Sequence, residues 1–104
     1  MKIRRLLENA EDVKKLANRL AKCPQVQALD DAEEKEAWTL AHSFSDIEES
    51  LVALLEGQLP RLVEHELEPS EVHELLLEIG EELRHVLYHI KDPKFYKYLQ
   101  QEGR

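Results

Sequence analysis

Apolar residues recur along most of this chain at steps of three and four, the spacing that places them on one face of an α-helix. The pattern is most regular over residues 70–92, so we expect this segment to form the central helix of the core. Its apolar positions are Val72, Leu75, Leu76, Ile79, Leu83, Val86, Leu87 and Ile90. Ser70 precedes them as an N-cap, a role in which serine is favoured.

Two further amphipathic helices are predicted before this segment. The first covers roughly residues 2–22 and stops before Pro24, because proline cannot continue a helix. The second begins after Asp30 or Asp31 and is ended or kinked near residues 57–60, where a glycine and a proline occur. The apolar positions of the second helix are Ala37, Leu40, Ala41, Phe44, Ile47, Leu51, Leu54 and Leu55.

Short helices are predicted near residues 60–67 and 93–101. The latter follows from Asp92-Pro93, which combines an N-cap with a proline at the first helical position. The predicted fold class is therefore all-α: a small helical bundle of three long antiparallel helices and two short ones. A chain of 104 residues has room for one modest core, so we expect a single helical domain over residues 1–104.

Composition supports this picture. Charged residues make up 35% of the chain and only 3 Gly and 4 Pro are present, which favours solvated helices over a loop-rich β fold. No apolar run approaches the roughly 20 residues that a membrane-spanning helix needs, and no signal peptide is evident. We therefore predict a cytoplasmic protein. Because Cys23 is the single cysteine, an internal disulfide is excluded, and we expect an unreactive, buried or partly buried thiol.

Charge is unevenly distributed. Residues 1–22 hold seven Lys and Arg against three acids, a net charge of +4, whereas the whole chain carries −8, so residues 23–104 carry −12. Between Asp46 and Glu82 there are twelve acids and a single Lys or Arg, Arg61. A large part of the folded surface is therefore expected to be negative, which disfavours binding to nucleic acid and to anionic lipid.

Two aromatic residues fall outside the predicted apolar stripes. Trp38 lies about 120° around its helix from Phe44, and Tyr88 points away from the apolar face of residues 70–92. Aromatic residues on polar faces are typical of interfaces, so both are candidates for contact with a second protein. The alternative is that they lie flat beneath neighbouring side chains.

A flank of the helix over residues 70–92 carries a candidate metal site. The candidate ligands are Glu78, Glu82, His85 and His89, which follow one another at spacings of four, three and four. The sequence from Glu82 to His85 has the Glu-x-x-His spacing of carboxylate-bridged di-iron bundles, and histidines at i and i+4 can chelate one divalent ion. No second Glu-x-x-His copy is present, so a solvated polar flank is the alternative interpretation.

An Arg-x4-His motif formed by Arg84 and His89 is followed by an Asp-Pro pair and an aromatic residue, in the segment RHVLYHIKDPKFYKYL. Here residues 80–100 resemble HEPN domains, small all-α proteins that act as RNases in toxin–antitoxin and defence systems or as partners of minimal nucleotidyltransferases. The resemblance implies an RNase site at a dimer interface, with Arg84 steadying a phosphate and His89 serving in acid–base chemistry or substrate orientation. On a straight helix the two side chains lie roughly 140° apart. A dimer partner or an early helix end would have to bring them together; otherwise Arg84 is expected to pair with a carboxylate such as Glu81.

The function predicted first is that of a non-enzymatic interaction or regulatory protein that presents its acidic surface to a basic protein partner, as a dimer or within a larger complex. The second alternative is a HEPN-like RNase or nucleotidyltransferase partner, and only here would RNA be bound. A divalent-metal-binding helical bundle is the third, and a divalent metal is the only cofactor considered. The sequence leaves the enzyme class open and favours a non-enzymatic role.

Overall fold

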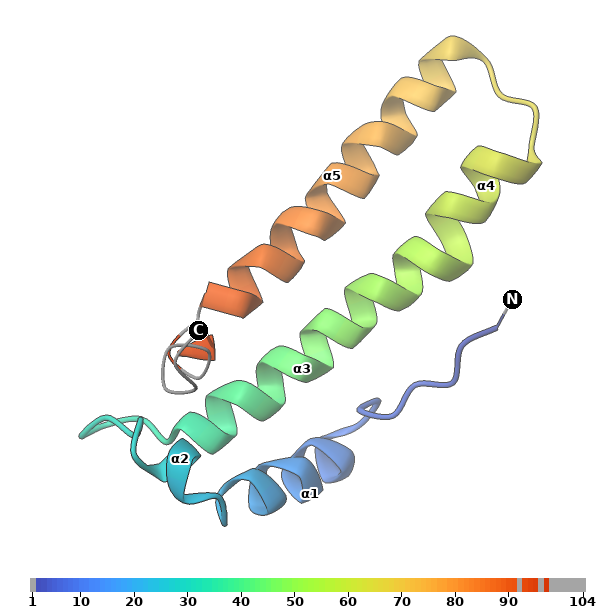
Figure 1. Cartoon of the computed structure of the whole chain (residues 1–104). Helices are drawn as coiled ribbons and strands as arrows, with labels where there is room; N and C mark the ends of the chain where they lie inside the picture. Colours follow the sequence, from blue (N-terminus) through green and yellow to red (C-terminus); the bar gives the residue numbers. More distant parts are fainter. Residues whose placement is uncertain (1, 92, 96, 98–104) are drawn as a thin grey trace.

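The computed structural model describes residues 2–91, 93–95 and 97, and these residues form helices joined by short connections, with no strand among them (Figure 1). The elements are α1 (Ala10–Leu20), α2 (Pro24–Gln27), α3 (Glu36–Val52), the π-helix η1 (Ala53–Gln58), α4 (Leu59–Glu64) and α5 (Pro69–Lys91). The protein is therefore all-α, as the sequence predicts. The two longest helices, α3 and α5, run in opposite directions along the molecule.

The second helix is longer than predicted, because α3, η1 and α4 follow one another without a break. Gly57 and Pro60 do not end it. A proline ring inside a helix clashes with the carbonyl oxygen four residues earlier, which here belongs to Glu56, and the π-helical turn covers that position. The short helix predicted at residues 60–67 is thus the continuation of the long one.

The start of α3 lies a few residues later than predicted, and Asp30 caps it from a distance. The N-cap residue Lys35 makes no side-chain cap hydrogen bond. Instead the Glu36 amide donates to a carboxylate oxygen of Asp30 at 2.8 Å. An acidic side chain thus satisfies one of the free amides at the helix N-terminus, a position where aspartate is favoured.

The first helix is shorter than predicted: α1 covers Ala10–Leu20 rather than residues 2–22. Asn9 has an extended backbone and its side chain accepts a hydrogen bond from the Asp12 amide, so the helix is capped at this point. The preceding segment runs beside the long helix in a non-helical form (Figure 1). Its amides bind an acidic side chain of α3 in place of helical carbonyls.

That acidic side chain belongs to Glu48. One of its oxygens accepts hydrogen bonds from Arg5 Nε at 2.8 Å and from the Leu7 amide at 2.9 Å, and the other accepts from the Leu6 amide at 2.8 Å. Burial alone would raise the pKa of the Glu48 carboxyl, but these hydrogen bonds and the Arg5 charge together lower it below its ordinary value. The carboxylate therefore anchors the N-terminal segment.

A cluster of buried apolar residues joins α1 to α3. Val13 and Ala17 of α1 and Ala41 of α3 are 5%, 2% and 0% exposed. Partly buried leucines pack around them: Leu7, Leu16 and Leu20. Small side chains at the contact let the two helix axes approach closely.

The expectation that residues 70–92 form the central helix is wrong. It is α3 that lies between α1 and α5 and packs against both (Figure 1). Within α5, which is described over its full length, Leu75 is the one buried residue. Periodicity identified the apolar stripe of α5 correctly but not its burial, because it does not say whether another element covers the stripe.

No helix in the described part of the chain is long and apolar enough to cross a membrane. The terminal helix predicted near residues 93–101 falls largely outside the described residues. Phe95 packs edge-on against Phe44, with ring centroids 6.1 Å apart, and the Lys94 amide donates to Glu36 at 3.1 Å. Burial raises the pKa of the Glu36 carboxyl, although the Lys94 hydrogen bond and charge oppose this. These contacts bring the chain after α5 back to the start of α3.

Candidate metal-binding site between α3 and α5

A row of polar side chains lines the face of α3 that meets α5. Ser43, Asp46 and Ser50 follow one another at spacings of three and four, which puts them on one side of the helix. The two serines are each 2% exposed. Buried hydroxyl groups need hydrogen-bond partners, and two histidines of α5 supply them.

His85 and His89 point at this row and at each other. Their Nε2 atoms are 2.9 Å apart, and the rings meet edge-to-face with centroids 4.5 Å apart. Nε2 of His89 also lies 3.1 Å from a carboxylate oxygen of Asp46. One ligand atom from each of the three residues lies within 4.8 Å of the others.

Serine hydroxyls contact the second nitrogen of each ring. Nδ1 of His85 is 2.7 Å from Ser50 Oγ, and Nδ1 of His89 is 3.4 Å from Ser43 Oγ. When Nδ1 donates its proton to the hydroxyl, Nε2 keeps a lone pair that faces the cluster. Metal-binding histidines are held in the same way, since an outer hydrogen bond fixes their tautomer and ring orientation.

The spacing of the ligand atoms is close to what a metal ion requires. Two unprotonated Nε2 atoms cannot remain 2.9 Å apart without a proton or a cation between them, because their lone pairs repel. In a tetrahedral zinc site with Zn–N bonds of about 2.0–2.1 Å, neighbouring ligand atoms are about 3.3 Å apart. Two of the three separations, 2.9 and 3.1 Å, are slightly shorter, and the third is within 4.8 Å, so rotations of the side chains would admit an ion.

The cluster is open on one side. The Asp46 side chain is 44% exposed, whereas that of His89 is 12% exposed. A pocket of about 490 Å³ lies beside His89 and is also lined by Trp38 and His42. An ion bound here would have three protein ligands, and on the exposed Asp46 side water could take a further position.

The candidate ligands predicted on α5 have different positions in the structure. His85 and His89 are brought together, but the two glutamates are not part of their cluster. Glu82 lies 3.5 Å from the side-chain amide of Gln58 in η1, and Glu78 is exposed. The carboxylate beside the histidines comes from another helix. Metal binding itself stays a prediction.

Sequence reasoning does not identify Asp46 or the two serines. Their spacing of three and four beside the apolar stripe of α3 is a signal that polar residues share one helix face. Which helix that face would meet depends on how the ridges of the two helices interdigitate, and hydrophobic periodicity does not specify this. The partner residues could therefore not be paired in advance.

Arg84 and His89 point in different directions within one chain. Arg84 has a side chain 72% exposed and pairs with Glu81 at 2.7 Å, whereas His89 faces α3 and contacts Asp46. The RNase site implied by the HEPN resemblance would need residues from a second copy. It stays a prediction.

The two predicted interface aromatics are accessible. Trp38 is 46% exposed and stacks on His42, with ring centroids 5.1 Å apart. Tyr88 is 60% exposed and meets the ring of His89 edge-on at 5.2 Å. Both aromatic residues therefore lie close to the histidines of α3 and α5, and their role at an interface stays a prediction.

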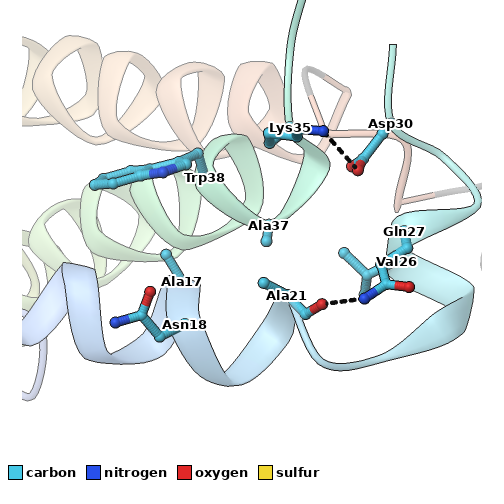
Figure 2. Close-up of a pocket in the computed structure, with 9 residues that line it drawn as sticks. All are labelled: Ala17, Asn18, Ala21, Val26, Gln27, Asp30, Lys35, Ala37 and Trp38. Carbon is cyan, nitrogen blue, oxygen red and sulfur yellow. Dashed lines mark hydrogen bonds and ion pairs between the residues drawn. The ribbon is translucent and has the colours of Figure 1, made fainter. Parts of the chain in front are cut away.

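Trp38 also forms one wall of a second pocket, of about 450 Å³, between α3 and the corner where α1 meets α2 (Figure 2). At its rim, Lys35 and Asp30 form an ion pair at 3.8 Å. The Gln27 side chain donates to the Ala21 carbonyl at 2.5 Å. These polar groups are already paired, so they are less available to bind a ligand than the side chains of the histidine cluster.

Comparisons with protein-family models, with curated proteins and with solved structures found no match to this chain. The geometry of the histidine cluster is therefore the basis for a functional proposal.

Proposed function

We propose that this protein binds a divalent transition-metal ion between α3 and α5, with Asp46, His85 and His89 as its ligands. The observation that carries the proposal is the convergence of one ligand atom from each residue within 4.8 Å. A histidine pair at i and i+4 can arise on any helix. Here a carboxylate from a second helix and two buried serines complete the set, which supports binding over a solvated flank.

The donor atoms favour particular ions. Imidazole nitrogen binds Zn²⁺, Fe²⁺, Ni²⁺ and Cu²⁺ well, whereas Mg²⁺ and Ca²⁺ require oxygen ligands. Two histidines and one carboxylate with further positions open occur at catalytic zinc sites and at non-haem iron(II) sites. Zn²⁺ is the first ion to test, because it accepts this donor set in tetrahedral geometry without redox chemistry.

Binding would link the two longest helices. In the helical bundle that the sequence predicts, an ion held by residues of both α3 and α5 would fix the distance between them. A metal ion that binds the folded chain but not the unfolded chain adds to the stability of the fold. At a free Zn²⁺ concentration a hundred times the Kd, the gain is about 2.7 kcal/mol.

The test is a calorimetric titration of the metal-free protein with Zn²⁺, followed by thermal unfolding with and without the ion. We expect one ion per chain and a higher Tm when it is bound. Asp46→Asn keeps the size of the side chain but removes its charge, and it should weaken Zn²⁺ binding by at least about tenfold.

His73→Ala is the matched control, because His73 is an exposed histidine on the same helix. This variant should retain the wild-type affinity. If a variant lacking both His85 and His89 bound Zn²⁺ as tightly as the wild type, the ion would bind elsewhere and the proposal would be wrong.

A second candidate is the acidic interaction protein that the sequence predicts first. Its supporting observation is that Glu74, Glu78 and Glu81 are exposed along α5. A basic partner bound to these carboxylates would be released as salt is added, because exposed charges are screened. Replacing the three glutamates by glutamine should then release a partner captured from native extract, and a complex that survived the replacement would argue against this candidate.

A further inference from the structure

α5 carries a row of exposed positions without a charged residue. Leu76, Leu83 and Leu87 are 54%, 47% and 54% exposed, and Gly80 between them is exposed as well. These four positions, here called the Gly80 row, follow at spacings of four, three and four. That spacing is characteristic of the contact line between two paired helices.

Gly80 lies at the middle of this row and of α5, which covers Pro69–Lys91. Glycine inside a helix is destabilising relative to alanine, so its presence calls for a compensating contact. A Cβ atom added at Gly80 would meet nothing within 4 Å. No close approach within the described chain therefore accounts for the glycine, whereas close approach of a second helix would.

The Gly80 row is also free of carboxylates, although α5 is an acidic helix. The glutamates of α5 are Glu71, Glu74, Glu78, Glu81 and Glu82. At about 100° per residue, all five fall on the half of the helix opposite Gly80. Two copies of α5 can therefore face each other along the row without bringing carboxylates together, and a basic partner would find no acid there to pair with.

The chain exposes more surface than a compact monomer of its mass. A monomer of 12.2 kDa is expected to expose about 6,100 Å², and this chain exposes 7709 Å². Its radius of gyration is 16.9 Å, where about 13 Å is expected for a compact domain of this length. The excess surface, about 1,600 Å², is larger than the roughly 800 Å² that each partner buries in a standard interface.

We propose that a second copy of this chain covers the Gly80 row, with the two α5 helices crossing at Gly80 around a twofold axis. In an antiparallel pair the residue on the axis faces its own copy, so the leucine before Gly80 meets the leucines after it in the other copy. Gly80 permits the close crossing, and the leucines supply apolar area for burial. The metal ligands lie on the side of α5 that faces α3, so this pairing does not depend on the ion.

Light scattering and sedimentation of the full chain at several concentrations test the pairing. We expect a dimer that dissociates on dilution. Leu83→Glu places a carboxylate in the row and should raise the dissociation constant at least a hundredfold. Val63→Glu is the matched control, since Val63 is 78% exposed on α4, and it should leave the dimer intact.

Gly80→Ala distinguishes the proposed dimer from the alternative in which Gly80 has no role in pairing. In an isolated chain the added methyl group meets no atom and improves helix propensity, so it should raise the Tm of the dissociated protein. In the proposed dimer the same methyl group meets the other copy and should weaken association at least tenfold. A variant with a higher Tm and unchanged association would show that the helices do not cross at Gly80.

Cross-linking gives a second readout. In a Cys23→Ser background, Gly80→Cys should form a disulfide-linked dimer under mild oxidation, because residues on the axis are close enough for the bond. Glu74→Cys, on the opposite half of the helix, should stay monomeric. A wild type that is monomeric at every concentration, or a dimer that Leu83→Glu leaves intact, would overturn the proposal and point to a different protein or a different surface.

Discussion

α3 meets α1 on one side and α5 on the other, and the two contacts are built from different kinds of residue. Against α1 it packs Ala41, which is 0% exposed, together with two buried residues of α1. Against α5 it presents Ser43 and Ser50, whose hydroxyls contact histidines. The first contact is apolar, whereas this part of the second is a set of hydrogen bonds.

The difference determines what each contact can do. Apolar packing is non-directional, so it holds two helices together without responding to particular ligands. A buried polar contact costs free energy when a partner is lost, and it strengthens when a proton or an ion satisfies its lone pairs. The α3–α5 contact is therefore the one through which a bound metal ion would change the stability of the fold.

The largest expected effect comes from the one buried residue of α5. Leu75 is 2% exposed, so Leu75→Ala removes apolar contacts and leaves a cavity, at a cost of about 2–5 kcal/mol in the free energy of unfolding. Denaturant unfolding measures this cost. If α5 is held mainly by its histidines, the loss will be well below this range.

Val63→Ala provides the comparison at an exposed apolar position. Val63 is 78% exposed on α4, so its truncation should change the free energy of unfolding by less than about 0.5 kcal/mol. Equal losses for the two variants would mean that Leu75 is not the apolar anchor of α5.

The contrast between local spacing and long-range contact explains which features of the fold could be predicted from the sequence. Hydrophobic periodicity predicted helices that include all of α3 and α5 from residue 71 onward, because helical spacing is a local property of the chain. The N-cap predicted at Ser70 is wrong, because α5 already begins at Pro69. It placed the central helix wrongly, because burial of the α5 stripe depends on an element that would have to cover it. Leu83 and Leu87 have the same spacing as buried residues but remain exposed within the chain.

The residues of the candidate site also differ in whether the sequence could predict them. His85 and His89 were predicted as a pair from their spacing on one helix. Asp46 was not, because its contact with His89 joins two helices far apart in the sequence. The early start predicted for α1 failed for a related reason: the amides of residues 6 and 7 bind Glu48, and this long-range contact outweighs local helix propensity.

A smaller effect is expected from the polar contact itself. Ser50→Ala leaves Nδ1 of His85 without its hydroxyl partner, which should cost about 1–3 kcal/mol in the free energy of unfolding. Zn²⁺ binding should weaken by about 10- to 100-fold, since the ring loses its outer hydrogen bond. Unfolding and calorimetric titration measure the two effects separately.

Ser45→Ala is the control from the other side of α3. Its hydroxyl donates to the Leu7 carbonyl at 2.9 Å, so its loss should cost about 1 kcal/mol or less and leave Zn²⁺ binding unchanged. A change in Zn²⁺ affinity for Ser45→Ala equal to that for Ser50→Ala would mean that the effect is not local to the histidines.

Control variants aside, the smallest expected effect concerns the segment before α1, which is held by charge. Glu48→Gln keeps the shape of the side chain but removes the charge that binds Arg5 and two amides, so at pH 7 it should cost about 1 kcal/mol. The pKa of Glu48 is lower in the folded chain than its ordinary value of 4.5, so this stabilisation is complete above about pH 4.5 and is lost as the pH falls through the folded pKa. Unfolding of the wild type and the variant at several pH values should therefore show two curves that converge in acid. Protection of the Leu6 and Leu7 amides from hydrogen exchange, relative to the intrinsic rate at each pH, should fall in the same pH range, whereas a difference in stability that persisted in strong acid would assign the effect to side-chain geometry and not to charge.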